Sequence, residues 1–404
     1  MSEPGTTVRL GDLVGLVKGA SYRSDDLRPG AAGLVGLACI RPGGGFISAA
    51  IKPFSGSFRD DQRLGVGDLV IALTDVTQTG SVIGRAARIP STVKDGTIVA
   101  SLDLAIVRFI SPLVAPEYLY YRLRAHDYIG AIYGAATGTT VRHLNPTDVL
   151  RFQLQLPSQS EQRGIAEVLG ALDDRIESNA RVMTLLDEFI RAVFESQFKV
   201  DPRDGGVPVD ELVEVNPVRR LRPGTPAAYV GMKSLPTTGS MIANWEQKPA
   251  GSGQRFTNGD TLIARITPCL ENGKTGFVNI LADGETGWGS TEYVVIRPKP
   301  PLPPEWGYCL ARDQSFREFA IRNMSGTSGR QRFPASALHH YRIEPPSTDR
   351  ARRFGELAGP SFRLMGVMQA ESGRLASLRD ELLPRLLSGV LRMRDATTLV
   401  GEAV

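Results

Sequence analysis

The side chains that most often perform catalysis are sparse in this chain. It has four histidines, and no HExxH pattern places two of them as metal ligands on one helix face. Cys39, Cys269 and Cys309 form no CxxC pair, so the sequence indicates neither a zinc knuckle nor a disulfide framework. We therefore expect no metal and no cofactor in this chain. Free thiols suit the cytoplasm.

A short segment around Glu271 has some features of a catalytic motif. Gly273-Lys274-Thr275 is similar to the end of a P-loop, but Pro268 stands where that motif begins with glycine. Glu271 and Lys274 have the residue types of a nuclease site. A surface ion pair or a hairpin turn is the interpretation we favour, and a nuclease is an alternative.

Length and charge limit the possible classes of protein. The chain has 404 residues, of which 42% are hydrophobic and 22% charged, as in globular proteins. Two or three domains are expected, since single cores rarely exceed about 250–300 residues. The net charge of +4 permits a nucleic-acid partner without requiring one. No signal peptide and no apolar run of about 20 residues is present, so we expect a cytoplasmic protein without a membrane partner.

The sequence repeats itself at a spacing of about 190 residues. The clearest matches, in order, are Gly67–Ala72 with Gly259–Ala264, Pro116–Tyr120 with Pro304–Tyr308, and Gly138-Thr139 with Gly326-Thr327. The strand-forming runs and first-turn prolines of each copy predict a β-rich globular part with short helices. After Pro157, Ser158 and Glu161 form a capping-box pattern that predicts the start of a long helix. The expected fold class is α+β.

Two long helices show the 3.5-residue period of a coiled-coil seam. The first seam comprises Ile165, Leu169, Leu172, Ile176, Asn179, Met183, Leu186, Ile190 and Val193, and the second Phe354, Leu357, Ser361, Leu364, Met368, Glu371, Leu375, Leu378 and Leu382. Gly359-Pro360 is expected to break or kink the second helix, and Pro384 to disturb it. Asn179 either specifies the register or reaches solvent at a loose seam. Asp173 and Asp187 are expected to face solvent, and Val168, Val182, Phe189 and Phe194 to widen a partner-docking surface.

Connectivity predicts how the copies are arranged. The first helix leads from one copy to the other, so the second helix can pair with it only by running back. The pair is then antiparallel, and a pseudo two-fold axis relates the copies. Dimeric DNA readers have such symmetry, with half-sites about 34 Å apart. Because the copies differ in sequence, we expect an asymmetric, bipartite target. A protein scaffold with two interaction heads is the alternative.

The chain resembles the specificity (S) subunits of Type I restriction–modification enzymes. The most specific segments are 157–179, PSQSEQRGIAEVLGALDDRIESN, and 378–389, LRDELLPRLLSG. Lys18–Tyr22 and the two Gly-Asp strand starts are similar to the family's recognition domains. The resemblance implies two β-rich target recognition domains, 1–157 and 201–346, separated by spacer helices at 158–200 and at 347–404, the latter with the C-terminal tail. In the second spacer, Arg350–Arg353 replaces the family's Glu-Gln pair.

The resemblance also implies partners and a function. The chain would be a non-catalytic subunit that binds double-stranded DNA. It would assemble with modification (methyltransferase) subunits, two of them, and with restriction subunits that are ATP-dependent translocases and nucleases. S-adenosylmethionine, ATP and magnesium would be bound by those partners and not by this chain.

Candidate DNA contacts follow from the side chains that such contacts need. Cations, hydroxyls and backbone N–H groups bind phosphates, and forked groups such as arginine and glutamine read bases. A solvated surface charge is the ordinary alternative for any one residue. The candidates are Lys18, Ser21, Tyr22, Arg23, Thr77, Gln78, Thr139, Thr140 and Arg142 in the first copy, and Arg219, Arg220 (matched to Lys18–Arg23), Arg265, Thr267, Ser325, Thr327, Ser328, Arg330 and Gln331 in the second.

Overall fold

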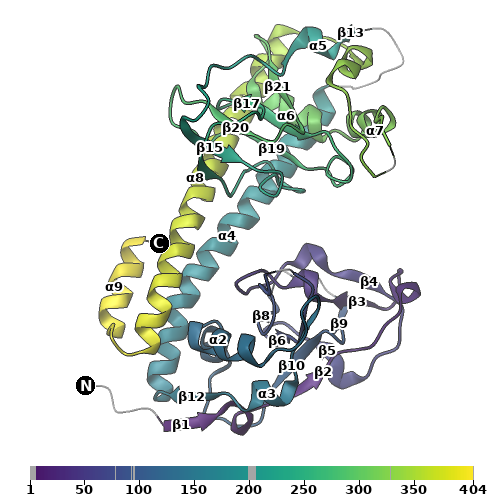
Figure 1. Cartoon of the computed structure of the whole chain (residues 1–404). Helices are drawn as coiled ribbons and strands as arrows, with labels where there is room; N and C mark the ends of the chain where they lie inside the picture. Colours follow the sequence, from purple (N-terminus) through teal and green to yellow (C-terminus); the bar gives the residue numbers. More distant parts are fainter. Residues whose placement is uncertain are drawn as a thin grey trace. The chain divides into compact units, whose positions relative to one another are not determined.

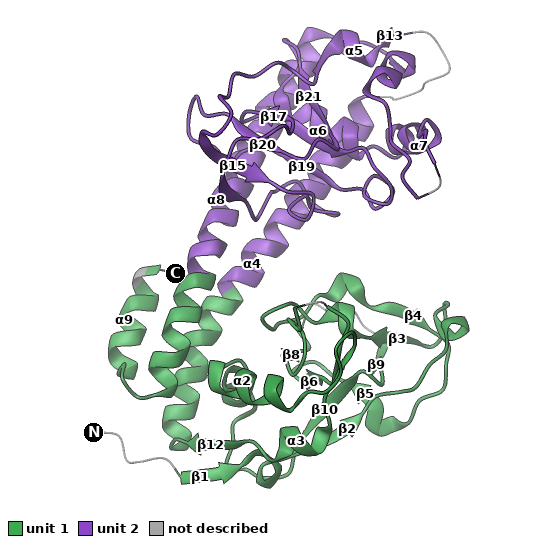
Figure 2. Cartoon of the chain, in the orientation of Figure 1, with its two compact units in different colours: residues 1–174, 376–404 green, residues 175–375 purple. Residues whose placement is uncertain are grey.

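The chain consists of two compact units, each with a β-rich part and a stretch of both long helices (Figure 2). Unit 1 comprises residues 1–174 and 376–404, and unit 2 comprises residues 175–375. The computed structural model describes residues 6–77, 79–91, 93, 96–198, 206–327 and 329–403. The boundaries of these units fall within the two long helices, whereas the predicted boundaries fall at the helix ends. The predicted division into recognition domains and spacer helices stays a prediction.

Unit 1 contains two four-stranded sheets. The first is antiparallel, in the order β2 (Val14–Lys18), β10 (Leu104–Phe109), β6 (Leu69–Ala72) and β8 (Ala86–Arg88). The second has the order β4 (Lys52–Phe54), β3 (Ala32–Val35), β9 (Thr97–Ala100) and β5 (Arg63–Leu64), in which β3 and β9 are parallel. Two small ladders join β1 (Thr6–Arg9) to β12 (Gln153–Leu156) and β7 (Thr74–Asp75) to β11 (Arg142–His143). The helices are α1 (Pro116–Arg122), α2 (His126–Ala135) and α3 (Pro146–Leu150).

Unit 2 repeats this topology, which confirms the internal duplication. Its antiparallel sheet has the order β14 (Val213–Val215), β21 (Tyr293–Pro298), β18 (Thr261–Ala264) and β19 (Thr275–Phe277). Its second sheet has the order β16 (Glu246–Pro249), β15 (Pro226–Val230), β20 (Gly287–Gly289) and β17 (Arg255–Phe256), again with a parallel central pair. β13 (Val207–Pro208) pairs with β22 (Arg342–Ile343), and the helices are α5 (Val209–Leu212), α6 (Pro304–Arg312) and α7 (Gln314–Arg322).

The long helices are α4 (Gln159–Gln197) and α8 (Thr348–Leu387). The predicted capping box starts α4, because Ser158 N donates to Glu161 Oε2 at 3.1 Å and Glu161 N donates to Ser158 Oγ at 3.3 Å. In unit 2, Asn179 contacts Glu371, and Phe194 contacts Phe354 further along α4. Partners of later α4 residues thus come earlier in α8, so the two stretches are antiparallel there (Figure 1).

Asn179 is buried between these helices. Its Nδ2 donates to Glu371 Oε2 at 2.8 Å and to Ser372 Oγ at 3.3 Å, while Arg175 Nε donates to Glu371 Oε1 at 3.0 Å. The hydrogen bonds from Arg175 and Asn179 lower the pKa of Glu371. The solvent-facing alternative for Asn179 is therefore wrong, and its buried amide has the contacts of a register-specifying residue.

The structure corrects the prediction for α8 at two points. The helix continues through Gly359-Pro360 and through Pro384 without a break. Leu364, predicted for the seam, is 45% exposed. The buried stripe there consists of Ala351, Phe354, Ala358, Phe362 and Met365. Phe362 packs on Phe277 and Tyr308 of the β-rich part. The stripe lies on one face of α8, and this stretch of the helix therefore packs on the β-rich part as well as on α4.

The other predicted seam residues have mixed burial. Those that are buried are Ile165, Leu169, Leu172, Ile190, Leu375 and Leu382, and those that are half-buried are Ile176, Met183, Leu186, Val193, Ser361, Met368, Glu371 and Leu378. Leu357 was predicted for the seam but is 37% exposed. In unit 1, the C-terminal helix α9 (Met393–Ala403) places Met393 against Gly164 of α4.

None of the described helices is long and apolar enough to cross a bilayer.

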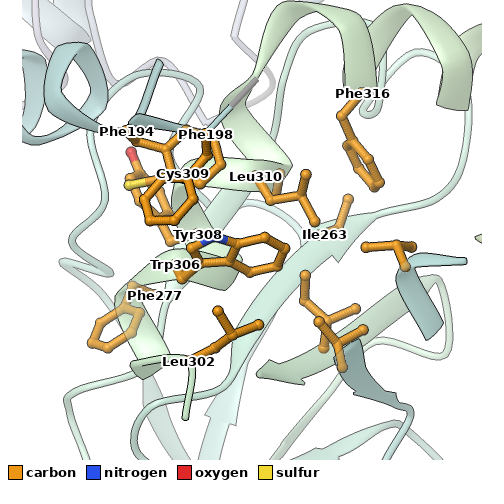
Figure 3. Packing of buried hydrophobic residues seen from close by; sticks show 14 of the residues in the cluster. Phe194, Phe198, Ile263, Phe277, Leu302, Trp306, Tyr308, Cys309, Leu310 and Phe316 are labelled. Carbon is orange, nitrogen blue, oxygen red and sulfur yellow. The ribbon is translucent and has the colours of Figure 1, made fainter. Parts of the chain in front are cut away.

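Aromatic side chains join the helices of unit 2 to its β-rich part. Trp306 of α6 is fully buried beside Phe194 and Phe198, with ring centroids 5.9 and 6.3 Å apart (Figure 3). Phe354 of α8 lies 6.0 and 5.3 Å from the same two rings. Burial of such large apolar surfaces is the main stabilising contribution to a core.

Candidate nucleic-acid interface

Several predicted residues of unit 1 gather at one end of its antiparallel sheet. Strands β2 and β6 end there and β10 begins there, because Lys18 pairs with Ala105 and Ala72 pairs with Leu104. Lys18, Ser21 and Arg23 are exposed, and Tyr22 is half-buried. Burial, followed by the charge of Asp103, raises the pKa of Tyr22.

The threonine-rich loop joins this end through the ladder between β7 and β11. Arg142 pairs with Asp75, and a bridge between Thr137 and His143 closes the loop. Gly138 has φ +98°, and a Cβ there would approach the Val141 carbonyl oxygen to 2.1 Å, so the loop requires glycine. The loop holds exposed hydroxyl side chains, those of Thr139 and Thr140. Its neighbouring guanidinium, that of Arg142, lies 4.4 Å from the ring centroid of Tyr133.

A buried carboxylate at the start of the predicted segment 75–78 organises the adjacent loop, a role that the sequence did not indicate. Asp75 is 1% exposed and accepts backbone hydrogen bonds from Thr77 at 2.6 Å, Val82 at 2.6 Å and Ile83 at 2.8 Å. Burial would raise the pKa of Asp75, but these hydrogen bonds outweigh it and leave the pKa below its ordinary value. Thr77 is half-buried, and the predicted Gln78 lies outside the described residues. An aspartate two residues before a threonine is a recognisable turn signal.

The corresponding end of the unit 2 sheet carries an arginine–glutamate cluster. Strand β18 ends at Ala264, opposite Tyr293. Glu292 accepts hydrogen bonds from Arg332 Nε at 2.9 Å and from Nη2 at 2.7 Å, and Arg265 Nε lies 3.5 Å from its Oε2. The hydrogen bond from Arg332 is the main cause that lowers the pKa of Glu292. Glu292 was not predicted, since its partners are distant in sequence.

Most predicted residues of unit 2 lie around this cluster. Thr267 N donates to the Gln331 carbonyl at 3.0 Å. Ser325 forms an antiparallel β-bridge with Arg332. Arg265, Thr267 and Gln331 are half-buried, and Ser325, Thr327 and Arg330 are exposed. Ser328 lies outside the described residues. The structure therefore brings the strand-end residues and the Gly-Thr loop of this unit together.

The predicted match of Arg219-Arg220 to the Lys18–Arg23 loop is wrong. Strand β2 continues to Lys18, but β14 ends at Val215, where Asn216 adopts φ +48° and Pro217 follows. Arg219 Nη2 pairs instead with Asp260 Oδ1 at 3.2 Å, and Asp260 precedes β18 at the end opposite to Arg265. Arg220 is exposed. A left-handed residue followed by proline explains why the chain leaves the sheet early.

Of the two residues proposed for a nuclease, Lys274 makes a contact with the backbone of its own unit. Lys274 Nζ donates to the Met232 carbonyl at 2.7 Å. Across the part of the chain that the structure describes, no three histidine, cysteine or carboxylate side chains converge as metal ligands. The turn interpretation of this segment is therefore preferred.

Comparisons with known proteins show sequence similarity over part of the chain. No protein-family model matches it. A stretch of 160 residues, 39% of this chain, is 29% identical to the specificity subunit of the Type I restriction enzyme EcoEI of Escherichia coli. Another comparison, over 122 residues and 29% of this chain, gives 34% identity to the EcoAI specificity subunit of the same organism. These stretches are 26% and 20% of the relatives' own lengths, so the chain spans about a quarter or less of the curated relatives it matches.

The fold comparison extends over nearly the whole chain. The S subunit of a Type I restriction–modification system from M. genitalium is similar with a TM-score of 0.55 and 15% identity, over 94% of this chain and 95% of that one. At this identity the likeness concerns the fold. The resemblance to specificity subunits of Type I restriction–modification enzymes is thus confirmed, in sequence over part of the chain and in fold over nearly all of it.

Proposed function

We propose that the chain is the non-catalytic specificity subunit of a Type I restriction–modification complex and reads a bipartite, asymmetric DNA target. The observation that best supports this is a strand order that occurs twice, with unlike polar residues at the equivalent sheet end. Unit 1 has Lys18 and Arg142 there, and unit 2 has Arg265 and Arg332. Two related folds with different contact residues suit two different half-sites.

The proposal includes partners and their cofactors. Two modification subunits would bind the helices and supply S-adenosylmethionine, and restriction subunits would supply ATP and magnesium. This chain would act in the cytoplasm and would hold no cofactor itself. Its contribution would be the recognition of DNA sequence.

A binding selection tests the DNA-reading function. The chain, assembled with its modification subunits, is incubated with random duplexes, and the bound DNA is sequenced. We expect two short sequence blocks separated by an unread spacer of constant length, with binding that weakens as salt increases. In the Arg142→Ala variant only one block should lose preference. A wild-type complex that selects no split sequence would support the scaffold alternative.

Exposed apolar residues on the helices of unit 2 form the proposed docking surface. Leu185 and Phe189, one turn apart on α4, are 59% and 50% exposed, and Leu364 and Val367 of α8 are also exposed. Large exposed apolar side chains on a helix face are typical of protein interfaces. The aliphatic stems and rings would pack against helices of a modification subunit.

Two residues predicted for that surface do not belong to it. Phe194 is buried by Trp306 and Phe354, and Val168 is buried on the side of α4 that lines a hollow with Met393 and Val400 of α9. Val182 is half-buried. The surface we propose is therefore the Leu185 and Phe189 face of α4, together with the exposed Leu364 and Val367 of α8.

Phe189→Asp should weaken binding of the modification subunit at least tenfold, because it places a charge in an apolar interface. The free energy of unfolding should change by less than about 0.5 kcal/mol, as for other surface substitutions. Affinity is measured by calorimetry with the purified modification subunit. The matched control is Val218→Asp, since Val218 is 96% exposed in the same unit and belongs to the loop between β14 and β15 instead of α4 or α8. Equal affinities of wild type and Phe189→Asp would refute this docking surface.

A further inference from the structure

Arg332 is held in one orientation by a carboxylate. Its Nε and Nη2 atoms both donate to Glu292, at 2.9 and 2.7 Å, which is a fork contact along one edge of the guanidinium. Its backbone is also held, because Arg332 N donates to the Ser325 carbonyl at 2.8 Å and Ser325 N donates back at 3.0 Å. The side chain is nevertheless 41% exposed.

The other edge of this guanidinium is available for a ligand. An arginine has two hydrogen-bonding edges, and Glu292 occupies the one formed by Nε and Nη2. On the second edge, Nη1 has a contact of 3.5 Å with the Arg330 carbonyl, at the limit of a hydrogen bond. Two parallel donors on an oriented guanidinium match the O6 and N7 acceptors of guanine in the major groove.

The cluster also keeps a net positive charge. Glu292 has one carboxylate, while Arg332 and Arg265 approach it with two guanidinium groups. Arg265 and Glu292 directly flank the paired ends of β18 and β21, where Arg265 N donates to the Glu292 carbonyl at 3.0 Å. The charged groups therefore stand on a rigid sheet end, as an element that reads bases requires.

The Glu292 cluster differs between the two units, whereas another ion pair of the same sheet is present in both. An arginine–aspartate pair at the other end of the sheet occurs in both units, as Arg108 with Asp68 and Arg297 with Asp260. Among the described residues at the equivalent positions of unit 1, no two arginines approach a carboxylate as Arg265 and Arg332 approach Glu292. In unit 1, the backbone hydrogen bond that corresponds to the one between Arg265 and Glu292 joins Leu73 to Asp103. The β-bridge that corresponds to the one between Ser325 and Arg332 joins Thr137 to His143. A feature present in one unit alone is expected of recognition rather than of folding.

We propose that Arg332 reads a guanine in the half-site bound by unit 2 and that Glu292 is the positioning residue that aligns it. This inference rests on the proposed DNA-reading function. Arg332 would then contact a base, whereas an arginine that only neutralises phosphate would contribute equally to every sequence.

The test is a sequence selection with the chain assembled with its modification subunits. Wild type, Arg332→Lys and Glu292→Gln are compared, together with Arg322→Lys on α7 as a control of equal charge in the same unit. Arg332→Lys keeps the charge and loses the fork, so preference for guanine at one position should fall roughly 5- to 100-fold while other positions persist. Glu292→Gln keeps the shape and should weaken preference at that same position. The control should select the wild-type sequence.

The outcomes distinguish this inference from the function on which it rests. If wild type selects no split sequence, the proposed function fails. If wild type selects one and Arg332→Lys retains every base preference, or loses all of them equally, Arg332 does not read a base and the inference fails alone. The affected block must also differ from the block altered by Arg142→Ala. If Arg332→Lys does not fold, the preference for guanine at that position is measured with Glu292→Gln instead.

Discussion

Asp173→Ala is expected to lower the free energy of unfolding of unit 1 by about 3 kcal/mol, because it leaves the enclosed guanidinium of Arg124 without its carboxylate and that of Arg379 with Asp380 alone. Asp173 of α4 accepts hydrogen bonds from Arg379 of α8 at 2.6 Å, Arg124 at 3.3 Å and Tyr121 Oη at 3.0 Å. The side chains of Arg124 and Arg379 are largely buried. Burial would lower the pKa of Arg379, but Asp173, and after it Asp380, outweigh burial and raise that pKa.

Urea unfolding monitored by circular dichroism measures this effect. Asp174→Ala is the matched control, since Asp174 is the exposed neighbour of Asp173 on the same helix. Asp173→Asn should be intermediate, because an amide keeps one acceptor and loses the charge. A free energy for Asp173→Ala within about 0.5 kcal/mol of the control would show that the network contributes little.

The sequence predicted those parts of the fold that depend on local signals. The start of α4 follows from the capping box of Ser158 and Glu161, and the duplication follows from paired motifs such as Gly67-Asp68 and Gly259-Asp260. Both kinds of signal lie within a few residues, so no knowledge of distant contacts is needed. The antiparallel helix pair followed from chain connectivity alone.

The errors concern residues whose partners are distant in sequence. Asp173 and Asp187 were expected to face solvent, yet Asp187 is buried and accepts a hydrogen bond from Tyr308 Oη at 2.8 Å. Leu364 fits a heptad, but the β-rich part of unit 2 competes with α4 for the packing face of α8. A helical period shows which residues share a face and does not show which element covers that face.

The candidate interface was predicted only in part, for the same reason. Glycine and threonine content identified the loops at Thr139 and Ser325, because loop composition is a local property. The positioning roles of Asp75 and Glu292 were not predicted, since each acts by binding groups that its strand and loop neighbours bring to it. Loop residues can thus be nominated from sequence, whereas the carboxylates that orient them require the fold.

Asp75→Ala should cost about 3 kcal/mol of unfolding free energy, because it leaves three backbone N–H groups of one loop without their acceptor. The hydrogen bonds hold the folded-state pKa of Asp75 below its ordinary value, and the unfolded-state pKa is about 3.9. The stabilisation is therefore fully present above that unfolded value and is lost as pH falls through the lower folded pKa. The difference between wild type and variant should thus be constant from pH 7 to pH 5 and shrink as the pH falls below about 4.

The same substitution should also change DNA reading, because the Asp75 carboxylate holds the Thr77–Ile83 loop beside Arg142, whose backbone pairs with that of Asp75 in the proposed interface of unit 1. In the sequence selection, Asp75→Ala should lose the block that Arg142→Ala alters and keep the block that depends on Arg332. Asp25→Ala, a change at an exposed residue of the same unit, serves as the control. A variant that loses both blocks, or neither, would contradict a local role for this loop, and a pH-independent difference down to pH 2 would contradict the role of its carboxylate.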